Sequence, residues 1–249
     1  MEAIWNWFAW LYQEHGINLV VFYNSYDRGM FFNGLYLTVQ MSVICIFLST
    51  IIGILGAWLQ GSALKIPRTI VYWYIQFFRN TPPLVQLYFF YFAVGNVLPR
   101  IENAGGGTSP IFSNLQWAII SFSFFAGAFN IEIFRAGIEA VPKSTIEAAE
   151  SLGYSRLKAY ITILLPLAFR ISLPALNNNL VNLVKTTTLA YAIAVPELLY
   201  VSAQIWSEEA NVREMMNLLL FIYIAIIGLL IFFMNRLERA LKIPGYTAQ

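Results

Sequence analysis

The sequence predicts an all-α membrane protein with five transmembrane helices, and three observations support this. Only 11% of the 249 residues are charged, whereas about 25% is usual in a soluble domain. Hydrophobic residues make up 59% of the chain, and its mean hydropathy is +0.63. The charges that are present leave long charge-free intervals. This composition excludes an ordinary soluble enzyme, and the near balance of 15 basic against 13 acidic side chains excludes a nucleic-acid-binding protein.

The charge-free intervals locate the spans, because a charge at the bilayer centre costs about 2.5–3.5 kcal/mol. Four intervals reach the ~20 residues that a spanning helix needs, and a fifth is interrupted only by Lys185. We therefore predict five spans, at residues 30–59, 67–97, 111–138, 166–195 and 212–237. They belong to a membrane domain over residues 30–242, which follows an N-terminal segment at 1–29 and precedes a tail at 243–249.

The distribution of basic residues predicts the orientation, because cytoplasmic loops are enriched in Lys and Arg. The connections on one side carry ten basic residues, and those on the other side carry Arg28, Arg100 and Arg213. We therefore expect the N-terminus outside, the C-terminus in the cytoplasm, and a long cytoplasmic loop at about 139–166. The ten are Lys65, Arg68, Arg135, Lys143, Arg156, Lys158, Arg170, Arg236, Arg239 and Lys242.

Two segments outside the predicted spans have simple expected roles. The N-terminal segment interleaves Trp5, Trp7 and Trp10 with acidic residues and lacks a basic start and a cleavage site, which is typical of an interfacial helix rather than a signal peptide. The glycine-rich residues 104–110 predict a flexible outer loop. A single cysteine, Cys45, and a single histidine leave no disulfide or metal site.

The second span is interrupted near its middle by Arg79-Asn80-Thr81-Pro82-Pro83. Both prolines lack a backbone donor, and the residue before a proline avoids the α-helical region, so the helix is expected to kink or break. Broken backbone at membrane depth is tolerated against protein or a watery cavity. The segment is therefore either a packing kink with Arg79 reaching toward water, or part of a substrate path.

The fourth span carries a polar stripe, because Asn178, Asn182, Lys185 and Leu189 recur on one helical face. Lys185 lies near the middle of this span, at the depth estimated for Asn80, and an ionisable residue inside a membrane indicates function. Either Lys185 is held by backbone carbonyls or a partner subunit, or both features line one site that suits a carboxylate. The candidate substrate-path residues are Arg79, Asn80, Gln86, Asn182 and Lys185.

Small residues recur four apart in two spans and predict close helix packing. They are Ser49, Gly53 and Ala57 in the first span, and Ser123 and Gly127 in the third.

The cytoplasmic loop has helix-forming residues in a specific pattern. Ser144 and Glu147 are spaced as a capping box that would start a short helix, and Gly153 suits a left-handed turn at its end. A second short helix, from about Ser155 to 161, would lead into Pro166. The two helices would present the small residues at 148 and 149 to a partner's groove.

This loop resembles the EAA loop of importer permeases of the ATP-binding cassette superfamily, with Glu147-Ala148-Ala149, then Gly153, then Ile163-Leu164-Leu165-Pro166. The resemblance extends to the polar amino acid (histidine, glutamine, arginine and opine) permease family over about residues 32–241. It is carried by residues 79–87, by Glu132-Ile133-Phe134-Arg135-Ala136-Gly137, and by Lys185-Thr186-Thr187-Thr188-Leu189. It implies a type I importer permease fold in a bacterial inner membrane.

The resemblance also implies partners and roles. The chain has no phosphate-binding loop of the GxxxxGK[ST] type, so a separate ATPase dimer would bind ATP and Mg and drive alternating access. A second permease subunit, either a paralogue or another copy, would complete the pore, and an extracytoplasmic binding protein would deliver the amino acid or opine. Glu147, Ala148, Ala149, Gly153 and Pro166 would form the ATPase-coupling element.

Two other classes compete with this interpretation. A self-sufficient channel or secondary transporter for a small solute would use Arg79 and Lys185 as a filter and would need no ATPase. A membrane-embedded enzyme would need catalytic motifs such as HExxH or GxSxG, which the sequence lacks. We therefore predict no catalytic and no metal-binding residues in this chain.

Overall fold

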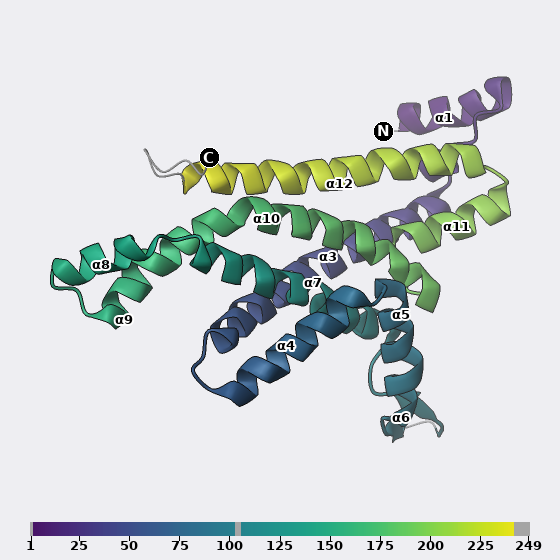
Figure 1. Ribbon diagram of the computed structural model, residues 1–249. Coiled ribbons are helices and arrows are strands. Elements are labelled where there is room, and N and C mark those ends of the chain that lie inside the picture. The colour runs from purple at the N-terminus through teal and green to yellow at the C-terminus, as the bar shows by residue number, and fades with distance from the viewer. Residues whose placement is uncertain (1, 103–105, 242–249) are drawn as a thin grey trace. The chain divides into compact units, whose positions relative to one another are not determined.

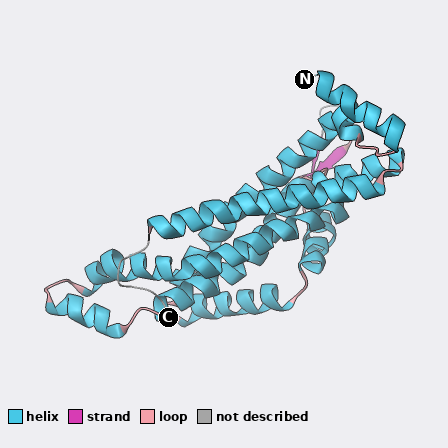
Figure 2. Ribbon diagram, turned by 90° about the horizontal axis from the view of Figure 1, so that it is seen from above, coloured by secondary structure: helices cyan, strands magenta, loops and turns pink. Residues whose placement is uncertain are grey.

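The computed structural model describes residues 2–102 and 106–241, and this part of the chain is almost entirely helical (Figures 1 and 2). The predicted tail at 243–249 and residues 104 and 105 of the predicted outer loop lie outside the described residues. The α-helices are α1 (Glu2–His15), α2 (Val20–Tyr23), α3 (Ser25–Gln60), α4 (Lys65–Asn80), α5 (Pro83–Tyr88), α6 (Gly95–Val97), α7 (Asn114–Glu139), α8 (Lys143–Ser151), α9 (Arg156–Ala159), α10 (Leu165–Thr186), α11 (Leu198–Glu209) and α12 (Val212–Ala240).

Three segments depart from α-helical geometry, and two short strands pair. Wider π-helical turns follow α5 and α9, and a tighter 3₁₀ segment follows α10. The strands form an antiparallel hairpin with Arg100 opposite Pro110, shown in magenta in Figure 2. The irregular segments are η1 (Phe89–Val94), η2 (Tyr160–Leu164) and η3 (Thr187–Ile193), and the strands are β1 (Arg100–Glu102) and β2 (Thr108–Pro110).

Within the described part of the chain, four helical stretches are long and apolar enough to cross a membrane. They correspond to the first, third, fourth and fifth predicted spans, whereas the second predicted span is divided into α4 and a shorter apolar helical stretch at Pro83–Val97. The stretch that corresponds to the fourth predicted span starts ten residues earlier than predicted, at Arg156, because α9, η2 and α10 follow one another without a loop. The all-α fold is therefore as predicted, with a break where the two prolines lie.

The chain divides into two compact units. Unit 1 comprises Met1–Ile44, Leu87–Ile119 and Val184–Gly228, and unit 2 comprises Cys45–Gln86, Ile120–Leu183 and Leu229–Gln249. Each unit brings together segments that are far apart in the sequence.

In unit 1, apolar side chains of α2, α3, α11 and α12 form one core around Phe31, Leu198 and Met215. Glu197 is fully buried beside this core and caps α11, because its carboxylate accepts hydrogen bonds from the backbone N–H of Leu199 (3.0 Å) and Tyr200 (2.9 Å). These bonds satisfy donors that a helix start would otherwise leave unpaired.

In unit 2, helices approach so closely that side chains are excluded at several points. A Cβ on Gly53 would lie 2.5 Å from the Cβ of Asn130, and a Cβ on Gly127 would lie 2.6 Å from Ile52. The small residues at 53 and 127 therefore serve helix packing, as predicted.

Helices α7 and α10 meet backbone to backbone in the same unit. A Cβ on Gly137 would overlap the hydroxyl of Ser172 and lie 2.6 Å from the carbonyl oxygen of Ala168. A second contact lies further along the pair, where Asn179 Nδ2 donates to Asn130 Oδ1 at 2.8 Å. The glycine and the buried amides hold the two helices together at two levels.

Candidate transport and coupling sites

The break in the second span is built as the two prolines predict. Helix α4 ends at Asn80, Thr81 is extended with φ −118° and ψ 143°, and α5 begins at Pro83. The Thr81 hydroxyl donates back to the carbonyl of Phe77 at 2.8 Å, and the Asn80 amide donates to the carbonyl of Gln76 at 2.7 Å. The side chains at 80 and 81 thus satisfy acceptors that the missing helical turn leaves open.

Gln86 of α5 stabilises the break through its side-chain amide. Its side chain is 1% exposed, and its Nε2 donates to the carbonyl oxygen of Phe78 at 2.8 Å and to that of Thr81 at 2.9 Å. It therefore ties the end of α4 to α5. Its role as a path residue stays a prediction.

Arg79 is paired with an acidic residue on α7. Arg79 Nη1 lies 2.7 Å from Glu132 Oε2, and the guanidinium carbon lies 5.3 Å from the centre of the Phe129 ring. The side chains of Arg79 and Glu132 are 39% and 29% exposed. Sequence reasoning did not assign a role to Glu132. The available signal was an acidic residue inside the third predicted span, which needs a partner at that depth.

The ion pair continues along α7. Arg135 Nη2 lies 3.4 Å from Glu132 Oε1, and Arg135 Nη1 lies 2.7 Å from Glu139 Oε1. Charges of alternating sign therefore run from the break in the second span to the end of α7, where the cytoplasmic loop begins in our prediction.

The polar residues predicted to share one face of the fourth span are exposed on α10. Asn178, Asn182 and Lys185 are all exposed on α10, whereas Thr186 is buried. Lys185 lies in the last α-helical turn, immediately before η3, and the hydroxyl of Thr188 donates to its carbonyl at 2.8 Å. Asn178 and Asn182 belong to unit 2 and Lys185 to unit 1.

Helix α8, the first helix of the predicted coupling loop, starts differently from our prediction. The residue that caps α8 is Pro142, no side chain caps the helix, and Ser144 lies inside its first turn. The predicted capping box is wrong because Pro142 has the fixed φ (−57°) that ends the preceding turn, and the helix begins directly after it. The expected helix itself is present at Lys143–Ser151.

The turn at Gly153 is as predicted. Gly153 has φ +87°, in the left-handed region that favours glycine, and Tyr154 N–H donates to the carbonyl of Ala149 at 3.1 Å to close the end of α8. Helix α9 then begins at Arg156 with Ser155 as its cap, since the Ser155 hydroxyl accepts from the N–H of Lys158 at 3.4 Å. Pro166 is the second residue of α10, which directly follows the π-helical turn η2 inside the continuous helical stretch.

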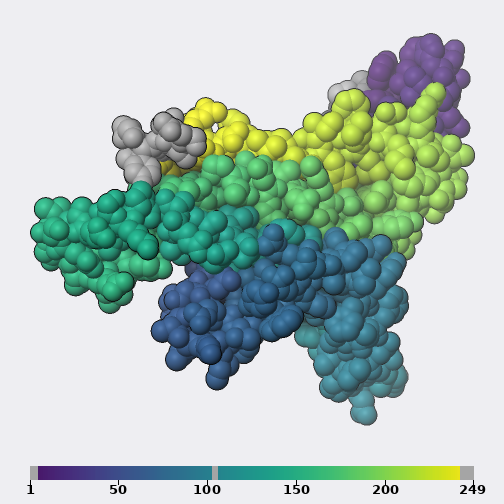
Figure 3. All heavy atoms as spheres, viewed as in Figure 1, coloured from purple at the N-terminus to yellow at the C-terminus, as the bar shows by residue number. Residues whose placement is uncertain are grey.

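The α8–α9 segment lies at the surface of the molecule, where its atoms are the teal spheres of Figure 3. Glu147 and Ala148 are exposed, and so are two large apolar side chains, Leu152 (81%) and Leu157 (70%). Ala149 is buried at 3% exposure, so it packs inside the chain and does not present itself to a partner. Of the two alanines predicted to face a partner's groove, only Ala148 is exposed, and its contact with a partner stays a prediction.

The α8–α9 segment packs against a buried apolar cluster. Ile146 of α8 and Tyr160 of η2 pack against a small buried cluster formed by Val141, Leu164 and Ala168. Exposed leucines on a short, anchored helical element are typical of a protein docking surface. Among the described residues, no group of three or more His, Cys, Asp or Glu side chains is arranged to hold a metal ion.

These features define a class of protein. Long apolar helices, a span broken at two prolines with an ion pair beside the break, and an anchored segment with exposed leucines are typical of a membrane transport protein.

Comparison with known proteins identifies the family. Residues 49–243 match the family described as "Binding-protein-dependent transport system inner membrane component", and the chain belongs to this family. It is a multi-pass inner-membrane permease subunit of an ATP-driven importer, which sets aside the self-sufficient channel or secondary transporter.

Several relatives are similar over most of their length. The chain is 36% identical over 206 residues to the probable amino-acid ABC transporter permease protein YckA of Bacillus subtilis (strain 168), covering 83% of this chain and 86% of the relative. It is 29% identical over 211 residues to the histidine/lysine/arginine/ornithine transport system permease protein HisM of Salmonella typhimurium, covering 85% and 89%.

Solved structures show the same fold. A chain described as "Crystal structure of an amino acid ABC transporter with histidines" superimposes with a TM-score of 0.74 at 24% identity, covering 86% of this chain and 94% of the other. A chain from inward-facing conformations of the MetNI methionine ABC transporter gives a TM-score of 0.69 at 20% identity, covering 88% and 100%. The type I importer permease fold is therefore correct.

Proposed function

We propose that this chain carries a polar amino acid, or an amino-acid-like solute such as an opine, through the membrane. The names of the relatives support the substrate class. The observation that carries the mechanism is the anchored, exposed segment α8–α9, with the glycine turn at 153. An ATPase subunit binds ATP and Mg and hydrolyses the ATP, and this chain does no catalysis itself.

The assembly contains two permease subunits, two ATPase subunits and an extracytoplasmic binding protein. The second permease is either a paralogue or another copy of this chain. The N-terminus faces outside and the α8–α9 segment faces the cytoplasm, as the distribution of Lys and Arg indicates. Glu147, Ala148 and the exposed leucines contact the ATPase, while Ala149, Gly153 and Pro166 keep the segment in shape.

A charge reversal at the docking element tests the coupling. Glu147→Arg in the reconstituted complex should abolish ATP-driven uptake, because an exposed acidic group meets a complementary surface on the ATPase. Glu238→Arg makes the same charge change at an exposed position on α12 and serves as the matched control. Normal uptake by Glu147→Arg would show that this segment does not couple the two subunits.

The substrate path runs past the break in the second span. Arg79 and Asn80 offer a cation and an amide there, Asn182 offers an exposed amide on α10, and Gln86 holds the break in place. Lys185 joins the path as the exposed cation of the polar stripe, in the last turn of α10 before the 3₁₀ segment. A substrate carboxylate that binds Arg79 competes with Glu132 for the guanidinium.

Substrate-stimulated ATPase activity tests the path. Arg79→Ala and Lys185→Ala should each raise the substrate concentration needed for half-maximal stimulation, while Arg236→Ala, which removes an exposed cation on α12, should not. Unchanged substrate dependence in both path variants would refute the assignment.

A further inference from the structure

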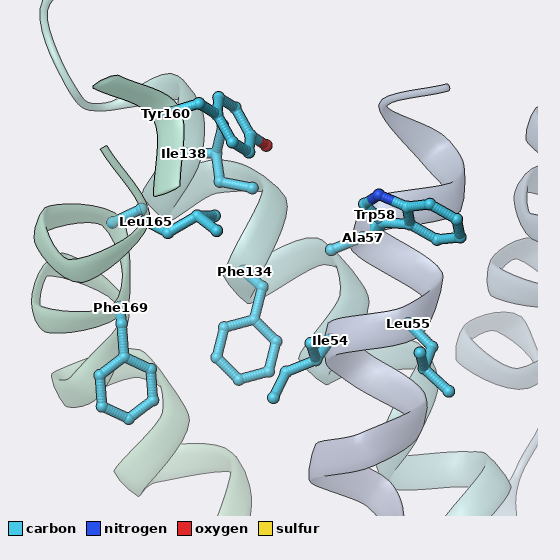
Figure 4. A pocket seen from close by; sticks show the side chains of 10 residues that line it. Ile54, Leu55, Ala57, Trp58, Phe134, Ile138, Tyr160, Leu165 and Phe169 are labelled. Carbon is cyan, nitrogen blue, oxygen red and sulfur yellow. The ribbon is translucent and has the colours of Figure 1, made fainter. Parts of the chain in front are cut away.

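Unit 2 contains a cavity of 310 Å³ between helices that come from distant parts of the chain (Figure 4). Its walls are formed by the end of α3, the end of α7, and the joined segment η2–α10. The lining residues are Ile54, Leu55, Ala57, Trp58, Phe134, Ile138, Tyr160, Leu165, Ala168 and Phe169.

The cavity suits an apolar ligand and not the transported solute. No charged side chain lines it, and the polar side-chain atoms of its walls are the indole nitrogen of Trp58 and the hydroxyl of Tyr160. A polar amino acid would bring two charges into this site without partners, and burying unpaired charges is costly. The cavity therefore lies outside the substrate path that we propose.

The dimensions of the cavity restrict what enters it. A helix is about 10–12 Å across with its side chains, so only one of its faces could enter a cavity of 310 Å³. An extended hydrocarbon chain is much thinner and enters such a cavity lengthwise.

The cavity has a polar end. Figure 4 shows Trp58 and Tyr160 on opposite walls toward the same end of the cavity, with Phe169, Ile54 and Leu55 toward the other end. Trp and Tyr are enriched where hydrocarbon meets the headgroups, because their rings are apolar and their tips are polar. The aromatic pair therefore marks the mouth at the membrane surface.

Basic residues lie close in the sequence to Trp58 and Tyr160, the two residues at this mouth. Lys65 and Arg68 open α4 just after the turn that follows Trp58, and Arg156 lies one helical turn before Tyr160. Lys65, Arg68 and Arg156 are all exposed, and none forms an ion pair among the described residues. Lys and Arg next to a membrane surface attract anionic headgroups.

We propose that this cavity holds one acyl chain of an anionic phospholipid, whose phosphate is bound by Lys65, Arg68 and Arg156. The lipid tail finds apolar surroundings in the bilayer as well as in the cavity, so the charged headgroup provides the preference for this site. The bound lipid fills the space between α3, α7 and η2–α10, next to the base of the α8–α9 segment. It acts as a structural lipid of the permease.

Photo-cross-linking in the assembled complex tests the proposal. The permease with its ATPase is placed in phosphatidylcholine nanodiscs that contain phosphatidylglycerol with a photoreactive diazirine on its acyl chain, and labelled peptides are mapped by mass spectrometry. We expect label in the peptides that contain residues 54–58 and 165–169. The same probe on phosphatidylcholine should label them less.

Two variants with a matched control sharpen the test. Leu55→Trp extends a half-exposed side chain (54%) into the cavity and should reduce the label about fivefold, the effect of roughly 1 kcal/mol. Phe47→Trp, at a 64% exposed position on the same helix outside the cavity, should leave it unchanged. Ile54→Phe, at 50% exposure, provides a second blocking variant if Leu55→Trp does not fold.

Neutralising the cations tests the headgroup. The triple variant Lys65→Gln, Arg68→Gln and Arg156→Gln should remove the preference for phosphatidylglycerol over phosphatidylcholine. Equal labelling of wild type and both blocking variants would overturn the proposal. So would equal labelling by the two wild-type probes, or zero-length cross-links that place a partner permease's side chain in the cavity.

Discussion

The turn at Gly153 allows a prediction whose size follows from its backbone. Gly153 has φ +87°, and a Cβ added there would meet nothing within 4 Å. The cost of Gly153→Ala is therefore conformational and not steric. A side chain in the left-handed region costs about 1–2 kcal/mol, which shifts the balance between this turn and a relaxed one by about 5–30-fold.

We expect Gly153→Ala to weaken binding of the ATPase to the permease by up to this factor, measured with purified subunits in nanodiscs. Gly228→Ala is the matched control, because a Cβ at Gly228 also meets nothing within 4 Å but the residue lies within α12 without a positive φ. It should bind normally. If Gly153→Ala matches wild type in binding and in coupled ATP hydrolysis, the left-handed turn is not what shapes the docking element.

Three further changes have defined outcomes. Gly137→Ala should lower the thermal unfolding midpoint, because its Cβ overlaps the Ser172 hydroxyl and overpacking costs about 1–3 kcal/mol; an unchanged midpoint would contradict the close approach. Gln86→Leu should destabilise the permease by about 1–3 kcal/mol in the same assay, because it leaves the carbonyls at the break unpaired. Glu132→Gln should cost only about 1 kcal/mol of stability, because the pair with Arg79 is partly exposed, yet it should impair uptake because Glu132 positions Arg79; normal uptake would show that the pair is not needed for transport.

Most of the helical pattern was predictable from the sequence, because the bilayer penalises charge and unpaired backbone groups wherever they occur. The charge-free intervals therefore predicted the spans, and the prolines at 82 and 83 predicted the break in the second span. Gly153 was predictable because few residues adopt a positive φ. Each of these signals is local in the chain.

What the sequence did not predict depends on tertiary contacts. The pairing of Arg79 with Glu132 joins residues 53 apart, and the burial of Ala149 results from packing of α8 against the helix that follows it. Helix α11 was missed because its twelve residues are too few for a span and its cap, Glu197, resembled a surface acid. The hairpin at β1 and β2 was predicted as a loop because its strands have only three residues each.

The close contact between α7 and α10 has a mechanical consequence. The α8–α9 segment leaves one of these helices and returns to the other. The two pack closely at Gly137 and Ser172, and the Ser172 hydroxyl donates to the carbonyl of Ile133 at 3.3 Å. We therefore expect a displacement of the segment to move both helices together. Helices α7 and α10 would then move as one rigid body, and Glu132 of α7, which pairs with Arg79, would move with them.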